Sequence, residues 1–125
     1  MTDKRPVYLN LLKIRLPVAG MVSFAHRISG VLLFLFIPYA VYLFDLSLTS
    51  AESFQQLHDT LNTPLMLLMQ LLVLWALTHH FFAGIRFLLI DAEIGIEKNS
   101  ARLGAWLVWL AEAVSMLAII CVVSS

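Results

Sequence analysis

The sequence is poor in cysteine and in charged residues. Cys121 is the single cysteine among 125 residues, so this chain makes no intrachain disulfide and cannot by itself hold an iron–sulfur cluster. We interpret Cys121 as a buried, inert thiol near a helix end. Only 13% of the residues are charged, and eight basic residues balance eight acidic ones. Such a balance gives no global field that would attract nucleic acid, and we expect no nucleic-acid partner.

Apolar residues, by contrast, are in large excess. They make up 61% of the chain, whereas soluble domains average roughly 45–50%. A chain of this length forms one domain at most, and so small a soluble domain could not bury that much apolar surface. Lipid is therefore the expected solvent.

Three long apolar stretches organise the chain, at residues 21–44, 65–90 and 103–123. Each exceeds the ~20 residues that a helix needs to cross the hydrocarbon layer. Because no water satisfies backbone groups in that layer, each stretch should be helical. The sequence thus predicts an all-α membrane protein with three transmembrane helices. Pro38 is expected to kink the first helix, which neighbouring helices can tolerate.

The remaining segments are 1–20, a polar connection at 45–64 and a second connection at 91–102. In the first connection, Ser53 or Thr63 could cap the start of a helix. The segment before the first apolar stretch does not resemble a cleavable signal peptide.

The distribution of basic residues predicts the orientation. The 45–64 connection and the C-terminus contain no lysine or arginine. By the positive-inside rule, the N-terminus and the 91–102 loop face the cytoplasm, while the 45–64 loop and the C-terminus face the periplasm. All eight basic residues agree with this orientation: Lys4, Arg5, Lys13, Arg15, Arg27, Arg86, Lys98 and Arg102.

His80, in the second apolar stretch, is a candidate haem ligand. Ala76 and Gly84 lie four residues to either side, on the same helical face, and would leave a flat slot beside the imidazole. On this slot we prefer His80 to His79 as an axial ligand. The alternative is a histidine that only hydrogen-bonds across a helix interface. No other histidine is expected at a matching depth, so a second axial ligand would come from another chain.

Polar residues near the start of the first helix suggest a quinone site. Ser23 and Arg27 share a helical face, and their hydroxyl and guanidinium groups could hydrogen-bond a quinone carbonyl. Arg27 would also stabilise negative charge during reduction. His26 could reach a haem propionate. The alternative places Arg27 at the membrane interface and His26 among the lipid headgroups.

Two further ionisable residues lie within the apolar stretches. Arg86 could bind a propionate or form a structural ion pair, with Asp91 nearby in the sequence. Glu112, near the middle of the third stretch, is expected to be protonated or paired, because an isolated carboxylate there is costly. We favour a structural hydrogen bond for Glu112 over a proton relay.

These residues together resemble the cytochrome b anchor subunit of bacterial succinate dehydrogenase, the subunit called C. Three segments carry the resemblance, in the order that the family has: Arg5-Pro6 through Ile14-Arg15-Leu16-Pro17, then Ser23-x-x-His26-Arg27-x-Ser29-Gly30, and His80-x-x-x-Gly84-x-Arg86-x-x-x-x-Asp91.

The resemblance implies roles for individual residues. His80 would be an axial ligand of haem b, and a second membrane-anchor subunit, called D, would supply the other ligand. Ser23 and Arg27 match quinone-site positions, while His26 and Arg27 match positions near the haem propionates. The three helices would then form half of a haem-binding heterodimeric bundle. Glu112 and His79 have no counterpart in the motifs.

The implied function is that of a membrane-anchor cytochrome b subunit of succinate:quinone oxidoreductase (complex II) in a bacterial inner membrane. Ubiquinone would be the substrate of the anchor. FAD and iron–sulfur clusters would lie on the flavoprotein and iron–sulfur subunits, because this chain has no dinucleotide fingerprint or cysteine cluster. Three alternatives stay open: the anchor of a menaquinol:fumarate reductase, a haem-free structural anchor, and a small transporter that uses Glu112.

Overall fold

The computed structural model describes residues 15–124, and within that range the chain is helical without strands. The helices are α1 (Val18–Thr49), α2 (Ala51–Leu61), α3 (Pro64–Asp91) and α4 (Lys98–Ser124). Helices α1, α3 and α4 are each long and apolar enough to cross a membrane. The expected all-α membrane protein with three membrane-spanning helices is therefore confirmed. Most of the predicted N-terminal segment, including Arg5-Pro6, lies outside the described residues.

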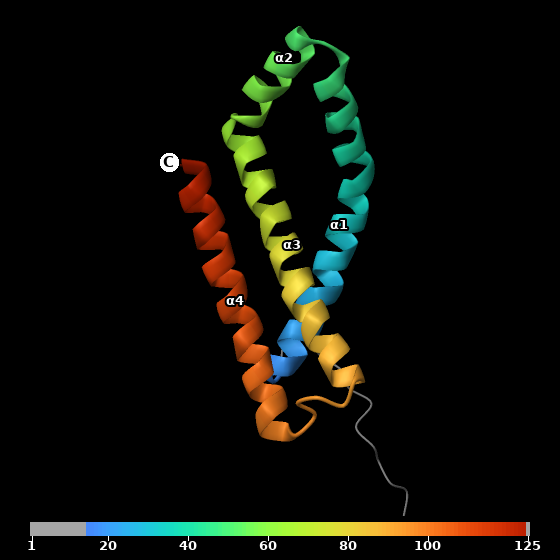
Figure 1. The fold of residues 1–125 in the computed structure, drawn as a ribbon, viewed down its shortest axis with the longest axis vertical. Helices are drawn as coiled ribbons and strands as arrows, with labels where there is room; N and C mark the ends of the chain where they lie inside the picture. Colours follow the sequence, from blue (N-terminus) through green and yellow to red (C-terminus); the bar gives the residue numbers. More distant parts are fainter. Residues whose placement is uncertain (1–14, 125) are drawn as a thin grey trace, which may run out of the picture.

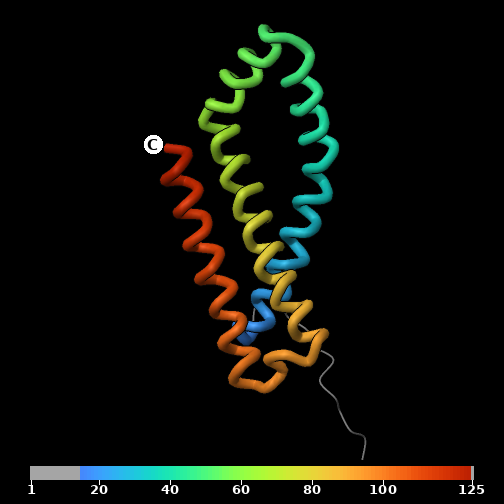
Figure 2. The backbone as a smooth tube through the Cα atoms, in the orientation of Figure 1, coloured from blue at the N-terminus to red at the C-terminus, as the bar shows by residue number. Residues whose placement is uncertain are grey.

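The three long helices meet near one end of the molecule. Figure 1 shows α1 crossing α3 there, with α4 running alongside α3, while α1 and α3 separate toward the other end. The same path is visible in the backbone tube of Figure 2. Small side chains permit the close approach, because Ala83 of α3 and Ala105 of α4 are fully buried. They form a core with Val22 and Val108. Helix α1 continues through Pro38 without a break.

The polar connection at 45–64 contains a helix that the sequence analysis did not predict. Ser50 is the N-cap residue of α2, and its Oγ accepts a hydrogen bond of 3.0 Å from the backbone N–H of Ser53. Ser53 is therefore not the cap. Thr63 does occupy the N-cap position of α3, without a capping hydrogen bond from its side chain, and Pro64 is the first helical residue. Proline suits this position because the missing N–H would have no intrahelical partner.

The connection between α3 and α4 begins with a tight helix stop. Glu93 has a φ of 61°, in the left-handed region. The backbone N–H of Ile94 donates to Leu89 O at 2.8 Å, and the N–H of Glu93 donates to Ile90 O at 2.9 Å. This pair of hydrogen bonds is the Schellman motif, which satisfies the carbonyl groups at the end of a helix. It turns the chain sharply before α4 starts.

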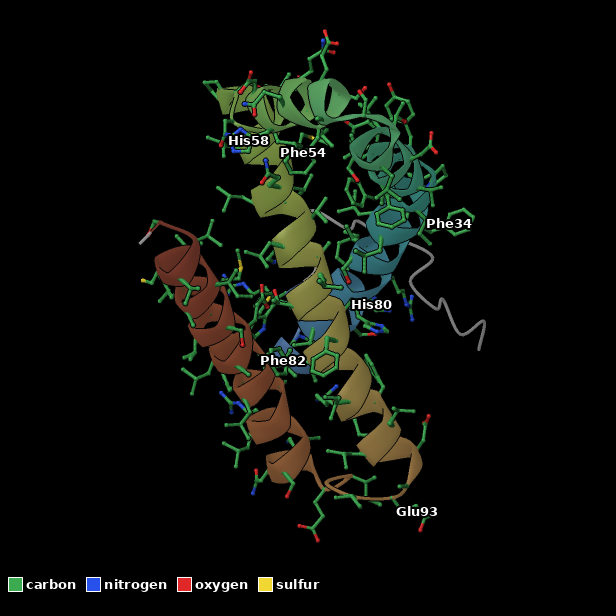
Figure 3. All side chains as sticks on the ribbon, turned by 45° about the horizontal axis from the view of Figure 1, so that its top comes forward. Phe34, Phe54, His58, His80, Phe82 and Glu93 are labelled. Atoms are coloured by element: carbon green, nitrogen blue, oxygen red, sulfur yellow. The ribbon has the colours of Figure 1, made fainter. Side chains whose placement is uncertain are left out.

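The outer faces of α1, α3 and α4 are apolar. Figure 3 shows side chains projecting outward from all four helices, and Phe34 on α1 is 72% exposed. In a soluble protein such a surface would aggregate, whereas in a bilayer it contacts lipid or another subunit. Cys121 belongs to this exposed surface, so our expectation that it is buried is wrong. Cys121 lies near the C-terminal end of α4, far from the end where the three long helices meet.

Candidate functional site

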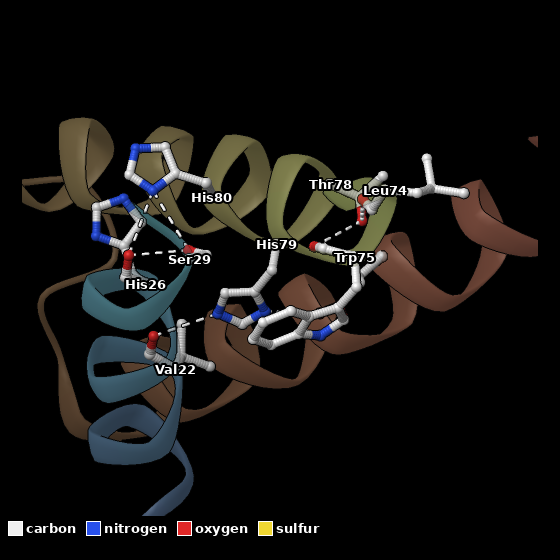
Figure 4. Close-up of polar contacts among 9 residues, drawn as sticks. Val22, His26, Ser29, Leu74, Trp75, Thr78, His79 and His80 are labelled. Atoms are coloured by element: carbon white, nitrogen blue, oxygen red, sulfur yellow. Dashed lines mark hydrogen bonds and ion pairs between the residues drawn. The ribbon is translucent and has the colours of Figure 1, made fainter. Parts of the chain in front are cut away.

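The imidazole of His80, on α3, is held by the backbone of α1. Its Nδ1 lies 3.3 Å from the carbonyl oxygen of His26 and 3.3 Å from Ser29 Oγ, as Figure 4 shows. The Ser29 hydroxyl donates its own proton to His26 O at 2.9 Å. A carbonyl can only accept, and the Ser29 proton is already engaged, so both contacts require a proton on Nδ1. The Nε2 atom of neutral His80 therefore carries the lone pair.

That lone pair is available to a ligand. Nε2 of His80 makes no hydrogen bond within residues 15–124, and the side chain is only partly buried. Metal-ligating histidines commonly donate from the other ring nitrogen to a carbonyl, which fixes the tautomer and the ring orientation. His80 has this arrangement.

A glycine lies beside His80, but it is not the one that the sequence analysis chose. A Cβ atom added to Gly30 of α1 would lie 3.1 Å from His80 Cε1. Gly84 instead faces His26, with its added Cβ 3.7 Å from that residue's Nε2. The His80 ring thus packs against Gly30 of α1, and Gly84 packs against His26. Periodicity within α3 could not reveal this, because it depends on how the two helices cross.

His26 lies at the same level as His80. The two rings stack with centroids 4.2 Å apart and planes 11° apart, and Phe87 packs beside His26 at 5.1 Å. Our expectation that no other histidine has a matching depth is therefore wrong. Parallel stacked rings cannot hold one metal between them, however, because imidazole lone pairs lie in the ring plane. His26 therefore cannot be a second ligand to a metal that His80 would bind in this geometry.

His79 differs from His80 in using both ring nitrogens. Its Nδ1 lies 2.7 Å from Glu112 Oε2 on α4, and its Nε2 lies 3.4 Å from Val22 O on α1. The His79 side chain is fully buried, and Glu112 is 4% exposed. No lone pair of His79 is left for a metal, which supports the preference for His80. Our expectation that Glu112 is paired is confirmed.

Ser23 and Arg27 lie one turn apart on α1, as predicted. The Arg27 side chain is exposed and makes no hydrogen bond or ion pair within residues 15–124. Ser23 is half-buried, and its hydroxyl is likewise not engaged by the described residues. Both polar groups are thus free to bind a ligand.

The Arg86 side chain, on α3, contacts α4. Its guanidinium donates from Nη2 to Ala101 O at 3.2 Å, lies 5.5 Å from the ring centroid of Phe87, and is 9% exposed. Its Nε is buried without a hydrogen-bond partner. Within residues 15–124 it forms no ion pair with Asp91. These contacts place Arg86 between α3 and α4.

Comparison with known proteins identifies the family of the chain. Residues 1–120 match the family described as "Succinate dehydrogenase/Fumarate reductase transmembrane subunit". The chain belongs to this family. The resemblance seen in the sequence motifs is thereby confirmed.

Two relatives of this transmembrane subunit are both named succinate dehydrogenase cytochrome b556 subunit. The protein from Coxiella burnetii (strain RSA 493 / Nine Mile phase I) is 39% identical over 121 residues, which cover 96% of this chain and 94% of the relative. The protein from Paracoccus denitrificans is 31% identical over 98 residues, covering 78% of this chain and 75% of the relative. As a member of the family, the chain is an anchor subunit of an enzyme complex and not an enzyme on its own.

One buried feature of this transmembrane subunit escaped the sequence analysis. The contact of His79 with Glu112 joins residues 33 positions apart on two helices. The only sequence signal was that each residue is polar within an apolar stretch, so a partner was required but could not be named. Among residues 15–124, no group of three or more His, Cys, Asp or Glu side chains could hold a metal ion alone.

Proposed function

We propose that the chain is the cytochrome b anchor of a succinate:quinone oxidoreductase and that it supplies half of a haem b site through His80. The observation that carries this proposal is the contact of His80 Nδ1 with the His26 carbonyl oxygen and Ser29 Oγ. Its Nδ1 proton is directed at the His26 carbonyl and Ser29, so that Nε2 is free to bind iron. The names of both relatives include cytochrome b556, which supports haem in this subunit type.

The residues present fit a haem whose second ligand comes from another chain. When bound, the haem supplies a one-electron carrier between the soluble redox centres and quinone. His80 would bind the iron, and the second membrane anchor of the complex would contribute the opposite ligand. The ring nitrogens of His26, which make no hydrogen bond among the described residues, and the free guanidinium of Arg27 would bind the propionates. We assign Arg86 to helix packing because it faces α4.

Ser23 and Arg27 would bind ubiquinone. Both present unengaged polar groups on one turn of α1, near the end where the helices meet. A hydroxyl and a guanidinium are hydrogen-bond donors suited to quinone carbonyl oxygens. As the quinone is reduced its oxygens gain negative charge, and a fixed positive charge at Arg27 would stabilise that charge.

The positions of the basic residues support an orientation of the chain in the membrane and a side on which the soluble subunits would bind. The basic residues of the described chain lie in, or just before, the helices that meet at one end. They are Arg15 before α1, Arg27 in α1, Arg86 in α3, and Lys98 and Arg102 in α4. We place that end at the cytoplasmic side of a bacterial inner membrane, with α2 and the C-terminus at the periplasmic side. The flavoprotein and iron–sulfur subunits, with FAD and the clusters, would bind on the cytoplasmic side.

The family includes fumarate reductases as well as succinate dehydrogenases. Both relatives described above are named succinate dehydrogenase, which favours succinate oxidation as the direction of the reaction.

The test is the variant His80→Ala in the complete complex, purified from native membranes. We expect loss of the low-spin bis-histidine haem spectrum while the other three subunits still copurify. The control is His58→Ala, which changes an exposed histidine on α2 and should leave the spectrum intact. An unchanged low-spin spectrum in His80→Ala would exclude the assignment.

A further inference from the structure

The buried pair of His79 and Glu112 lies directly beside the proposed iron ligand. We propose that it is a positioning pair, which holds the His80 segment of α3 against α1 and α4 and thereby sets the orientation of the His80 imidazole. This inference rests on the proposed haem site and deepens it. Neither residue touches the haem in this proposal.

The two adjacent histidines contact carbonyl groups on consecutive turns of α1. His79 Nε2 lies 3.4 Å from Val22 O, and His80 Nδ1 lies 3.3 Å from His26 O. Val22 and His26 are four residues apart, which is about one helical turn. The side chains of His79 and His80 point in different directions from α3. They nevertheless reach carbonyl groups on consecutive turns of α1, as Figure 4 shows. Any rotation or sliding of α1 against α3 that breaks the first contact also changes the second.

Glu112 fixes the other side of the His79 ring. The Val22 carbonyl can only accept, so His79 Nε2 carries a proton. Its Nδ1 then either donates to a Glu112 carboxylate or accepts from the protonated carboxyl group, at 2.7 Å in the structure. In both cases the hydrogen bond is kept and the pair has no net charge. The link between α3 and α4 thus does not depend on where the proton lies.

The packing around His79 leaves its ring little freedom. Trp75 of α3 lies on the ring at a centroid distance of 5.7 Å, and Trp109 of α4 lies at 4.8 Å. The His79 side chain has no exposed surface. Three helices therefore meet at one imidazole, and a change there is transmitted to the next residue along α3, which is His80.

A matched control separates this polar link from ordinary packing. Val108 is 4% exposed, belongs to the same core and lies one turn before Glu112 on α4. Val108→Ala loosens the helix junction without removing a hydrogen bond. Glu112→Gln keeps a hydrogen-bonding group opposite His79, whereas Glu112→Met keeps the side-chain length and removes that group.

The experiment compares these variants in the complete complex by low-temperature electron paramagnetic resonance of the haem, haem midpoint potential and the rate of haem loss to an apoprotein acceptor. We expect Glu112→Gln and Val108→Ala to match the wild type. Glu112→Met should shift both the g values and the midpoint potential and increase the rate of haem loss several-fold. Wild-type values in Glu112→Met, or an equal shift in Val108→Ala, would overturn the positioning role.

Glu112→Met leaves His79 Nδ1 buried without a hydrogen-bond partner, and this can lower the yield of assembled complex. A second variant covers that case. Replacing both polar partners by apolar groups avoids that penalty. The double variant His79→Leu/Glu112→Met should assemble and still show the shifted haem signature, and a wild-type signature would refute the positioning pair. The His80→Ala experiment is independent: if its spectrum is unchanged the haem site itself is wrong, whereas wild-type signatures here remove only the positioning role.

Discussion

The imidazole rings of His26 and His80 stack nearly parallel, with centroids 4.2 Å apart. His26 comes from α1 and His80 from α3, so the stack joins the two helices at their crossing. The backbone carbonyl of His26 also faces His80 Nδ1 at 3.3 Å. His26 thus contacts His80 in two ways. Its ring lies on the face of the His80 ring, and its backbone carbonyl oxygen faces His80 Nδ1. The orientation of His80 should therefore respond to small changes in α1.

Gly30→Ala tests that dependence on α1. The added Cβ would lie 3.1 Å from His80 Cε1, closer than ordinary van der Waals contact, so the ring must move by a few tenths of an ångström. We expect shifted haem g values at retained haem content for alanine, and loss of haem for Gly30→Val. The control is Gly20→Ala in the same helix, where the nearest atom is 3.5 Å away. Full haem content with wild-type g values in Gly30→Val would contradict the packing described here.

Ser29→Ala removes one of the two acceptors that face His80 Nδ1. The His26 carbonyl remains, so the tautomer of His80 should be kept. A hydrogen bond of this kind contributes about 1 kcal/mol, which corresponds to a haem dissociation rate about fivefold faster. Haem transfer to an apoprotein acceptor measures this rate. A complete loss of haem would show that the serine, and not the carbonyl, fixes the ring.

Arg27→Leu should impair quinone reduction and leave succinate oxidation intact. Losing a charge-assisted hydrogen bond of about 1.5–3 kcal/mol lowers kcat/KM for ubiquinone by roughly 10- to 160-fold. Activity with a soluble dye that accepts electrons from the soluble subunits should not change. Arg102→Leu, another exposed arginine but on α4, serves as the control and should keep normal quinone kinetics. Equal losses in both variants would mean that surface charge, and not a quinone contact, is responsible.

Glu93→Gly should stabilise the turn after α3. Glu93 has a φ of 61°, where a residue with a Cβ is strained and glycine is not. The expected gain is up to about 1 kcal/mol in the unfolding free energy, read as a higher thermal midpoint of the purified complex. Ala92→Gly should lower the thermal midpoint. Ala92 has a φ of −84°, which strains no residue, so glycine there only adds backbone entropy to the unfolded chain. A lower midpoint for Glu93→Gly would be inconsistent with strain at this position.

The sequence was sufficient to predict those features that depend on a single segment of the chain. The three long apolar stretches predicted α1, α3 and α4, because a run of that length in lipid has no alternative to a helix. Glu112 was expected to be paired for a similar reason, since a lone carboxylate in an apolar stretch is costly. His80 was preferred over His79, and the free Nε2 of His80 supports that choice.

Features that depend on how two helices cross could not be predicted. The partner of Glu112, the stacking of His26 on His80 and the position of Gly30 against His80 all require the α1–α3 and α3–α4 geometry. Helix α2 was missed for a different reason. Its residues are mixed in polarity, and the cap at Ser50 is a weak signal unless the helix is already known to be there.

Helix α2 also determines how far apart α1 and α3 stand at their distant ends. A rod of eleven helical residues is about 16 Å long, whereas two packed helices lie only about 8–10 Å apart. A flexible loop would let α1 and α3 close on each other, but a rigid bridge holds them open above their crossing, where apolar residues such as Phe36 and Val73 line the space between them. The subunit is thus shaped like a wedge, open toward the α2 end and closed where the histidines meet.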